Sequence, residues 1–201
     1  EVVKELFENK TIAIIGSSPT ILDHEYGAAI DAHDVVMRIN LHGIHGRPEC
    51  LGSRTDVRYI GARLDESYQP AIYEIIENET LILKAYNAWI EQGIHVPVYY
   101  SGFKMYKYFE KLPSNLLDGI NRYKHTTSGT NAIAIALDNG AACVNLYGFS
   151  METSKRWYSM NQNGETVKYN PAQLRRCHCE PDQEIEILNR VMQHCPVRVG
   201  C

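Results

Sequence analysis

Short runs of apolar residues, separated from one another by helical patterns, recur along this chain. The runs predict strands at 11–15, 34–40, 56–61, 80–85, 96–100 and 143–149, and a short closing strand at 197–200. Amphipathic or alanine-rich segments predict helices at 24–32, 70–78, 103–112, 129–140 and 181–194, and a short helix within residues 1–10. Alternation of strands with helices indicates an α/β fold with a mostly parallel, Rossmann-like sheet flanked by helices. Because no repeat, low-complexity tract or linker interrupts the pattern, residues 1–201 are expected to form a single domain.

Composition narrows the classes of protein that this chain can represent. Its 201 residues, 44% hydrophobic and 22% charged, can bury a sizeable core. The net charge is −4 and no long basic run occurs, which argues against a nucleic-acid partner but leaves room for a local anion site. No apolar run approaches the length of about 18 residues that a membrane span needs, and no signal peptide opens the sequence, so we expect no membrane span in this chain.

Six cysteines are a further candidate for chemistry. Four of them lie near the end of the chain together with two histidines, but the set has no CxxC pair and matches no common zinc-ligand spacing: Cys50, Cys143, Cys177, Cys179, Cys195 and Cys201, with His178 and His194. We therefore expect no metal there, and either free thiols or one disulfide near the end of the chain.

The stretch IAIIGSSPTIL carries the first specific signal. An apolar strand ends in Gly16, Ser17 and Ser18, and Pro19 then favours the start of a helix. A strand that ends in a glycine- and serine-containing loop before a helix is where α/β proteins bind anions. The loop has neither the spacing of a Walker A loop nor that of a dinucleotide fingerprint, so it predicts an anion site of another kind.

A second helix start of similar chemistry lies at TTSGT, where Thr127, Ser128 and Gly129 precede an alanine- and isoleucine-rich helix. A plain N-cap is one interpretation. The other is a second anion site beside the sheet, and two such sites predict a ligand with two negative groups. The metal-binding Asp-x-Asp motif of many sugar transferases is absent. The nearest pair, Asp31 and Asp34, has the wrong spacing and is expected to cap a helix–strand junction.

Both stretches resemble motifs of a known family. IAIIGSSPTILDHEYGAAIDAHDVVMRIN, followed by LGSRTDVRYIG, resembles the large sialylmotif of the animal-type sialyltransferases. TTSGTNAIAIALDNGAACVNLYGF resembles the small sialylmotif. KRWYS and HCEPDQE stand where the family has two shorter motifs.

The resemblance implies a glycosyltransferase of a variant GT-A fold. Such an enzyme transfers sialic acid from CMP-sialic acid to a glycan hydroxyl with inversion, without a metal or other cofactor. The CMP donor has one phosphate and one sugar carboxylate, which matches the two predicted anion sites. The donor-binding residues implied are Gly16, Ser17, Ser18 and Asn40 on the CMP side, Thr127, Ser128 and Gly129 on the carboxylate and ribose side, and Gly148 and Phe149 beside the cytidine. Tyr158 and Trp157 are candidates for either the donor site or the core.

The same resemblance suggests the catalytic groups. His178 stands at the position of the family's catalytic histidine, and an unperturbed pKa near 6.5 suits a general base at neutral pH. Glu184 is expected to orient the ring, with Glu180 as the rival. Arg156 or Trp157 replaces the histidine of the third motif, and an arginine could serve as the phosphate partner.

Departures from the family pattern leave alternatives open. Ser17 replaces the family's asparagine, and Ile12 and Ala141 replace the cysteines of the central disulfide of the Golgi enzymes. The missing disulfide favours a reducing, cytoplasmic compartment and a divergent bacterial, viral or plant-like lineage. The alternatives are a transferase that uses CMP-Kdo, another acidic 2-keto sugar donor, and a non-catalytic nucleotide- or glycan-binding module.

Overall fold

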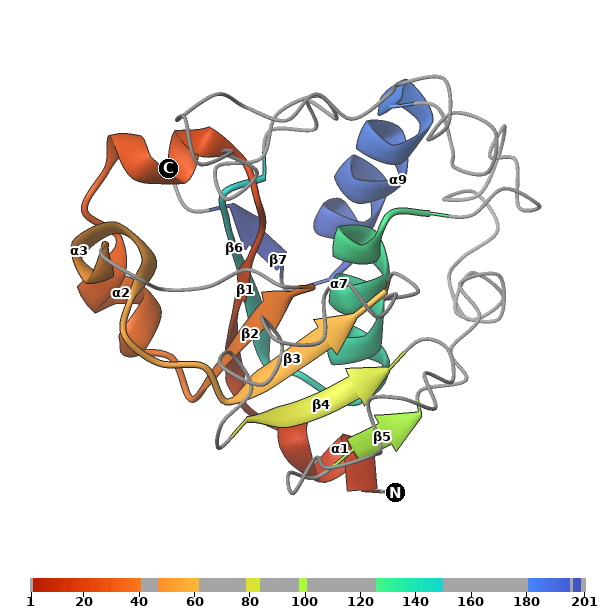
Figure 1. Ribbon diagram of the computed structural model, residues 1–201. Coiled ribbons are helices and arrows are strands. Elements are labelled where there is room, and N and C mark those ends of the chain that lie inside the picture. The colour runs from red at the N-terminus through yellow and green to blue at the C-terminus, as the bar shows by residue number, and fades with distance from the viewer. Residues whose placement is uncertain are drawn as a thin grey trace, which may run out of the picture.

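The computed structural model describes residues 2–40, 47–61, 79–83, 98–100, 126–149, 181–195 and 197–199. Within these ranges the strands form one sheet in the order β5-β4-β3-β2-β1-β6-β7, and all of its neighbouring strands are parallel (Figure 1). The strands are β1 (Thr11–Ile15), β2 (Val35–Ile39), β3 (Val57–Ile60), β4 (Thr80–Leu83), β5 (Val98–Tyr100), β6 (Cys143–Tyr147) and β7 (Val197–Val199). The predicted α/β class with a parallel sheet is confirmed.

The strand order creates a switch point between β1 and β6. The chain adds strands outward from β1 to β5, and β6 then pairs with the other side of β1. Ile15 lies opposite Tyr147 in this pairing, so the segments that follow β1 and β6 leave the sheet side by side. Ligands of open α/β sheets bind outside the carboxyl ends of the strands at such a point.

One face of the sheet is covered by α7 (Ser128–Asp138) and α9 (Pro181–His194), as Figure 1 shows. Every residue of α7 from 130 to 136 is buried, because the helix lies across the face formed by β6, β1, β2 and β3. Apolar residues of α9 at helical spacing (Ile187, Leu188 and Val191) join the same core. The short helix α1 (Val2–Phe7) contributes Phe7 to it.

The opposite face is covered by shorter elements, among them α2 (Gly27–Asp31) and α3 (Pro48–Leu51), which Figure 1 shows on that side. The 3₁₀ helix η1 (Pro19–Asp23) packs with them. Ile21, Ile30 and Leu51 pack there against Ala13 and Ile15 of β1. Helix α3 was not among the elements predicted from the sequence. It has only four residues and begins at a proline, so it is too short to show a helical period.

Two arginines are fully buried in neighbouring strands, Arg38 in β2 and Arg58 in β3. Arg58 donates to both carboxylate oxygens of Glu79, over 2.5 and 2.7 Å. Arg38 donates to the carbonyl oxygens of Leu51 and Arg54, over 2.7 and 2.9 Å. Burial, and secondarily the charge of Arg58, lower the pKa of Arg38 to about 10. These hydrogen bonds connect residues 51–54 to β2, and Glu79 to β3.

Most predicted elements within the described ranges are confirmed, β1 and α9 with the predicted ends and the others with ends that differ by at most three residues. The expected helices 70–78 and 103–112 lie outside the described residues. The predicted helix 24–32 is shorter, Gly27–Asp31.

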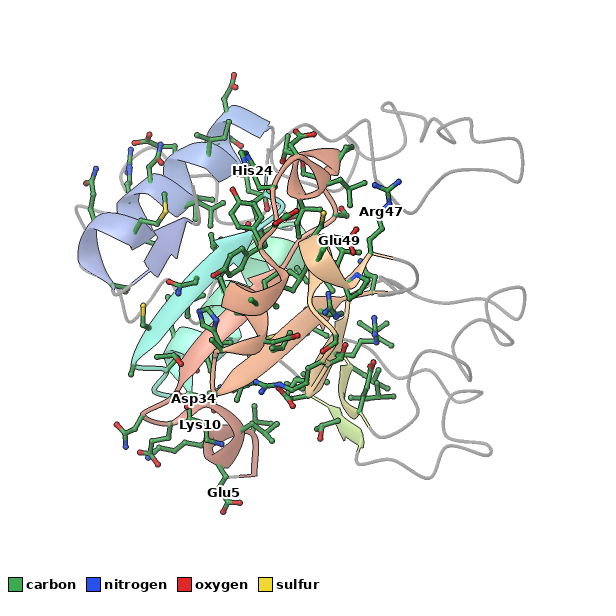
Figure 2. All side chains as sticks on the ribbon, turned by 90° about the vertical axis from the view of Figure 1, so that its left-hand side faces the viewer. Glu5, Lys10, His24, Asp34, Arg47 and Glu49 are labelled. Atoms are coloured by element: carbon green, nitrogen blue, oxygen red, sulfur yellow. The ribbon has the colours of Figure 1, made fainter. Side chains whose placement is uncertain are left out.

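The predicted capping by Asp31 and Asp34 is wrong, because both carboxylates bind segments distant in sequence. Asp34 accepts from the N–H and hydroxyl of Thr11, each over 2.8 Å, and Asp31 accepts from the N–H and hydroxyl of Ser53, each over 2.8 Å. In Figure 2, Asp34 lies beside Lys10, toward the end of the molecule opposite His24 and Arg47.

Candidate functional site

Four segments that follow neighbouring strands meet at the carboxyl edge of the sheet. They carry Gly61 after β3, Asn40 after β2, Gly16 to Ser18 after β1, and Gly148 to Phe149 after β6. The first turn of α7 lies over the same edge, since Ser128 and Gly129 contact two of these segments. Ser17, Asn40, Ser128, Gly129, Gly148 and Phe149 are all half-buried, so this edge is partly open to solvent.

The loop after β1 is held tightly against the loop after β6. The N–H of Gly16 donates to the carbonyl of Tyr147 over 2.7 Å, and the N–H of Ser18 donates to the carbonyl of Gly148 over 2.9 Å. A Cβ at Gly16 would lie only 2.4 Å from the carbonyl oxygen of Gly148, and Gly148 itself has a φ of 69°. The backbones of Gly16 and Gly148 touch at the switch point, and only glycine therefore fits at both positions.

Ser18 and Ser17 have different roles in this loop. The hydroxyl of Ser18 accepts from the N–H of Thr20 over 3.3 Å and caps η1, and the side chain is buried. Ser18 is therefore an N-cap of η1, and its hydroxyl is already engaged by the backbone. Ser17 is half-buried and is the loop residue that remains accessible to a ligand.

The ring of Phe149 lies between the two predicted anion sites and contacts both. A Cβ at Gly16 would lie 2.9 Å from one edge carbon of its ring, and a Cβ at Gly129 would lie 2.8 Å from another. The ring is therefore packed against the backbone of both glycines. The structure thus brings together Gly16, Gly129 and Phe149, which lie far apart from one another in the sequence.

Asn40 and Ser128 meet through a residue that the sequence analysis missed, Gly61. The N–H of Gly61 donates to Oδ1 of Asn40 over 3.0 Å, and a Cβ at Gly61 would lie 2.1 Å from Oγ of Ser128. Asn40 has a φ of 55°, and its carbonyl accepts from Nη1 of Arg58 over 2.7 Å. A glycine directly after a strand of a parallel sheet was the available signal for Gly61.

The amino-terminal end of α7 is capped by a different helix. Thr127 is the N-cap residue but makes no capping bond with its own side chain. Instead, Oε1 of Glu184 in α9 accepts from the N–H of Thr127 over 2.6 Å and from the hydroxyl of Thr130 over 2.7 Å. The plain N-cap interpretation of the threonine and serine hydroxyls is therefore not what the structure shows.

The remaining predicted site residues lie outside the described residues: His178, Arg156 and Tyr158, and the alternatives Glu180 and Trp157. The role of Glu184 as a partner of His178 therefore stays a prediction. In the described ranges, no three His, Cys, Asp or Glu side chains gather where they could hold a metal ion. In the same ranges Cys50 and Cys143 are free thiols. Among the helices described, none has both the length and the apolar composition to cross a membrane.

Comparison with known proteins gives consistent matches. The model of glycosyltransferase family 29 (sialyltransferase) matches residues 8–85. A CMP-N-acetylneuraminate-beta-galactosamide-alpha-2,3-sialyltransferase 1 of Gallus gallus is 27% identical over 188 residues, which cover 80% of this chain and 50% of the relative. Its Mus musculus counterpart is 25% identical, with 82% and 52% covered. This chain thus spans about half the length of these curated relatives.

Solved structures show the same fold. A mammalian sialyltransferase in complex with Gal-beta-1-3GalNAc-ortho-nitrophenol has a TM-score of 0.60 at 18% identity, and 98% of this chain and 71% of that chain are covered. The sialyltransferase CstII from Campylobacter jejuni, in complex with the substrate analogue cytidine-5'-monophosphate, has a TM-score of 0.57 at 16% identity, with 96% and 81% covered.

Proposed function

We propose that this chain, a relative of the family 29 sialyltransferases, transfers an acidic 2-keto sugar of the sialic acid type from its CMP-activated donor to a glycan hydroxyl. One observation carries the proposal most directly. The loop after β1 and the first turn of α7 pack against the same phenylalanine ring at the switch point of the sheet. The two predicted anion sites are thus neighbours, as one ligand with two negative groups requires.

The geometry suggests how such a donor would bind. The backbone and hydroxyl of Ser17 would meet the phosphate at the end of β1, and Gly148 and Phe149 would border the cytidine. The carboxylate of the sugar would meet Ser128 and Gly129, because N–H groups in the first turn of a helix have no acceptor within the helix and point outward. Gly129 lets a ligand approach that backbone closely. Asn40 would contribute from the end of β2.

The proposed chemistry assigns the groups near the end of the chain. His178 would take the proton of the acceptor hydroxyl as its oxygen attacks the anomeric carbon, and the bond from that carbon to the CMP phosphate would break. Attack from the side opposite the leaving phosphate inverts the anomeric centre. Arg156 would stabilise the charge on the departing CMP, and Tyr158 would line the donor site. Hydrogen bonds and a helix end would then stabilise the single phosphate without a metal ion or other cofactor.

We also propose a reducing, cytoplasmic compartment. The positions of the family's central disulfide hold Ile12, fully buried in β1, and Ala141, which is 9% exposed. The free thiols at Cys50 and Cys143 agree with such a compartment. Fractionation of the source cells, with thiol labelling before lysis, tests this proposal. Recovery of the protein in an oxidised, secreted fraction would refute it.

The function is tested by a transfer and release assay with CMP-N-acetylneuraminate and CMP-Kdo side by side, each with and without EDTA. We expect CMP to be released from the first donor at the same rate in EDTA. Gly129→Val should abolish release, since the added side chain would clash with the ring of Phe149. Glu186→Gln, on an exposed part of α9, is the matched control and should retain the native rate.

Each other outcome has a definite meaning. Consumption of CMP-Kdo alone would replace the sialic acid donor by Kdo on the same site. Binding of CMP with no turnover of either donor, in the presence of glycan acceptors, would indicate the non-catalytic module. Loss of activity in EDTA that Mg²⁺ restores would refute the metal-independent mechanism.

A further inference from the structure

Glu184 is a carboxylate on the buried stripe of α9. It lies at positions i, i+3, i+4 and i+7 with Ile187, Leu188 and Val191, the three residues that pack into the core beneath the helix. Its side chain is 2% exposed. Burial of a carboxylate is unfavourable unless hydrogen bonds compensate it, so its contacts indicate what it does.

Both described contacts of Glu184 go to the first turn of α7. Oε1 accepts from the backbone N–H of Thr127 over 2.6 Å and from the hydroxyl of Thr130 over 2.7 Å. Charge-assisted bonds of this length are among the stronger hydrogen bonds in proteins. The negative charge also lies at the positive end of the helix dipole. Glu184 thus fastens the beginning of α7 to α9.

Ser128 and Gly129, which lie between these two contacts, are the residues to which the proposed function assigns the donor's carboxylate. Ser128 packs against Gly61, and Gly129 packs against Phe149. We propose that Glu184 is a positioning residue, which holds Ser128 and Gly129 in register with the ends of β3 and β6 so that the donor's carboxylate can bind. This inference rests on the proposed function.

The same carboxylate has a second, opposite effect. It places a negative charge at the helix end where the donor's anion would bind, so its hydrogen bonds favour the site while its charge repels the ligand. A glutamine keeps the acceptor oxygen and loses the charge. A methionine of similar length loses both. The difference between these two variants reports the hydrogen bonds alone, because neither carries a charge.

The experiment measures the affinity of the full chain for CMP-N-acetylneuraminate, by calorimetry over times too short for turnover, and kcat in the transfer assay. We expect Glu184→Gln to bind the donor about threefold more tightly than the native chain, because a repulsive charge next to the helix end is gone. Glu184→Met should bind about tenfold more weakly than Glu184→Gln, because the N–H of Thr127 and the hydroxyl of Thr130 lose their acceptor. Thr130→Val, which keeps the charge of Glu184 and removes one of the two donors, should bind the donor more weakly than the native chain does. Glu186→Gln is the control and should bind as the native chain does.

Three results would overturn the inference. Equal donor affinity in Glu184→Gln and Glu184→Met, with only the unfolding midpoint lowered, would show a merely structural cap. A lower kcat in both variants, with unchanged donor affinity, would show that Glu184 acts on the base instead. If Glu184→Met does not fold, Thr130→Val decides, and native affinity in that variant overturns the inference. Failure of the native chain itself to bind CMP or the donor would instead refute the proposed function.

Discussion

Gly61→Ala is the sharpest test of how the candidate site is built. The added methyl group would lie 2.1 Å from Oγ and 2.8 Å from Cβ of Ser128, and 3.2 Å from an edge carbon of Tyr59. The first two distances are shorter than any contact that real side chains tolerate. Rotation of the Ser128 hydroxyl relieves only the first. The beginning of α7 or the end of β3 must therefore move.

The expected loss of stability follows from two opposing effects. Forcing a methyl group into a filled space costs about 1–3 kcal/mol. Replacing glycine by alanine also restricts the unfolded chain, which stabilises the protein by about 0.4–1 kcal/mol. The clash is larger, so we expect the free energy of unfolding to fall by about 1–2 kcal/mol. Donor affinity should fall as well, because Ser128 is displaced.

The assay is urea denaturation of Gly61→Ala, Ser128→Gly and the double variant. Ser128→Gly removes both clashing atoms, so it should stabilise the Gly61→Ala chain although it destabilises the native one. Gly140→Ala is the matched control. The added Cβ at position 140 would be strained by the φ of 84° but would lie 3.5 Å from the nearest atom, so no clash arises. Ser128→Gly should therefore not restore the stability of Gly140→Ala. Native stability in Gly61→Ala, or no rescue by Ser128→Gly, would refute the described packing of Gly61 against Ser128.

Three further predictions test other parts of the molecule. Glu79→Ala should lower the free energy of unfolding by about 3–5 kcal/mol, because it removes the carboxylate that forms an ion pair with the buried Arg58. A free energy of unfolding, measured by urea denaturation, that stays within about 1 kcal/mol of the native value would contradict this, since that is the effect of a surface ion pair. Hydrogen bonds from the N–H and hydroxyl of Thr11 lower the pKa of Asp34. The native chain should therefore lose stability relative to Asp34→Asn as the pH falls from about 4 through that lowered pKa. If the stabilities of the two chains keep a constant difference between about pH 5 and pH 2, this is contradicted. His178→Ala should lower turnover by about two to four orders of magnitude with little change in CMP affinity. The rate of the native chain should fall as the pH drops through about 6.5. Turnover of the variant within about threefold of the native rate would exclude His178 as the base.

Local sequence patterns were enough to predict the strands, the class of fold and the two loops of the site. A short, mostly apolar run bounded by polar or turn-forming residues favours a strand over a helix because of its length, and TIAII and CVNLY form β1 and β6. Glycine, serine and proline after such a run also have local preferences, which place the loop at Gly16 and the start of α7 at Ser128. The motifs around both loops also indicated the resemblance to sialyltransferases, and the family model matches the part of the chain that holds the first of them, residues 8–85.

What the site is made of, in contrast, was decided by the tertiary structure. Gly61 gave only a weak signal in the sequence, and its importance comes from Ser128, which α7 brings to within contact of it. Glu184 was expected to orient a histidine six residues earlier, whereas its described partners are Thr127 and Thr130, the first of them 57 residues away. A buried carboxylate binds whichever donors the packing of two helices places beside it, and that packing depends on the whole core. Local preferences determine elements, but only the folded chain determines which polar groups lose water together and must therefore bind each other.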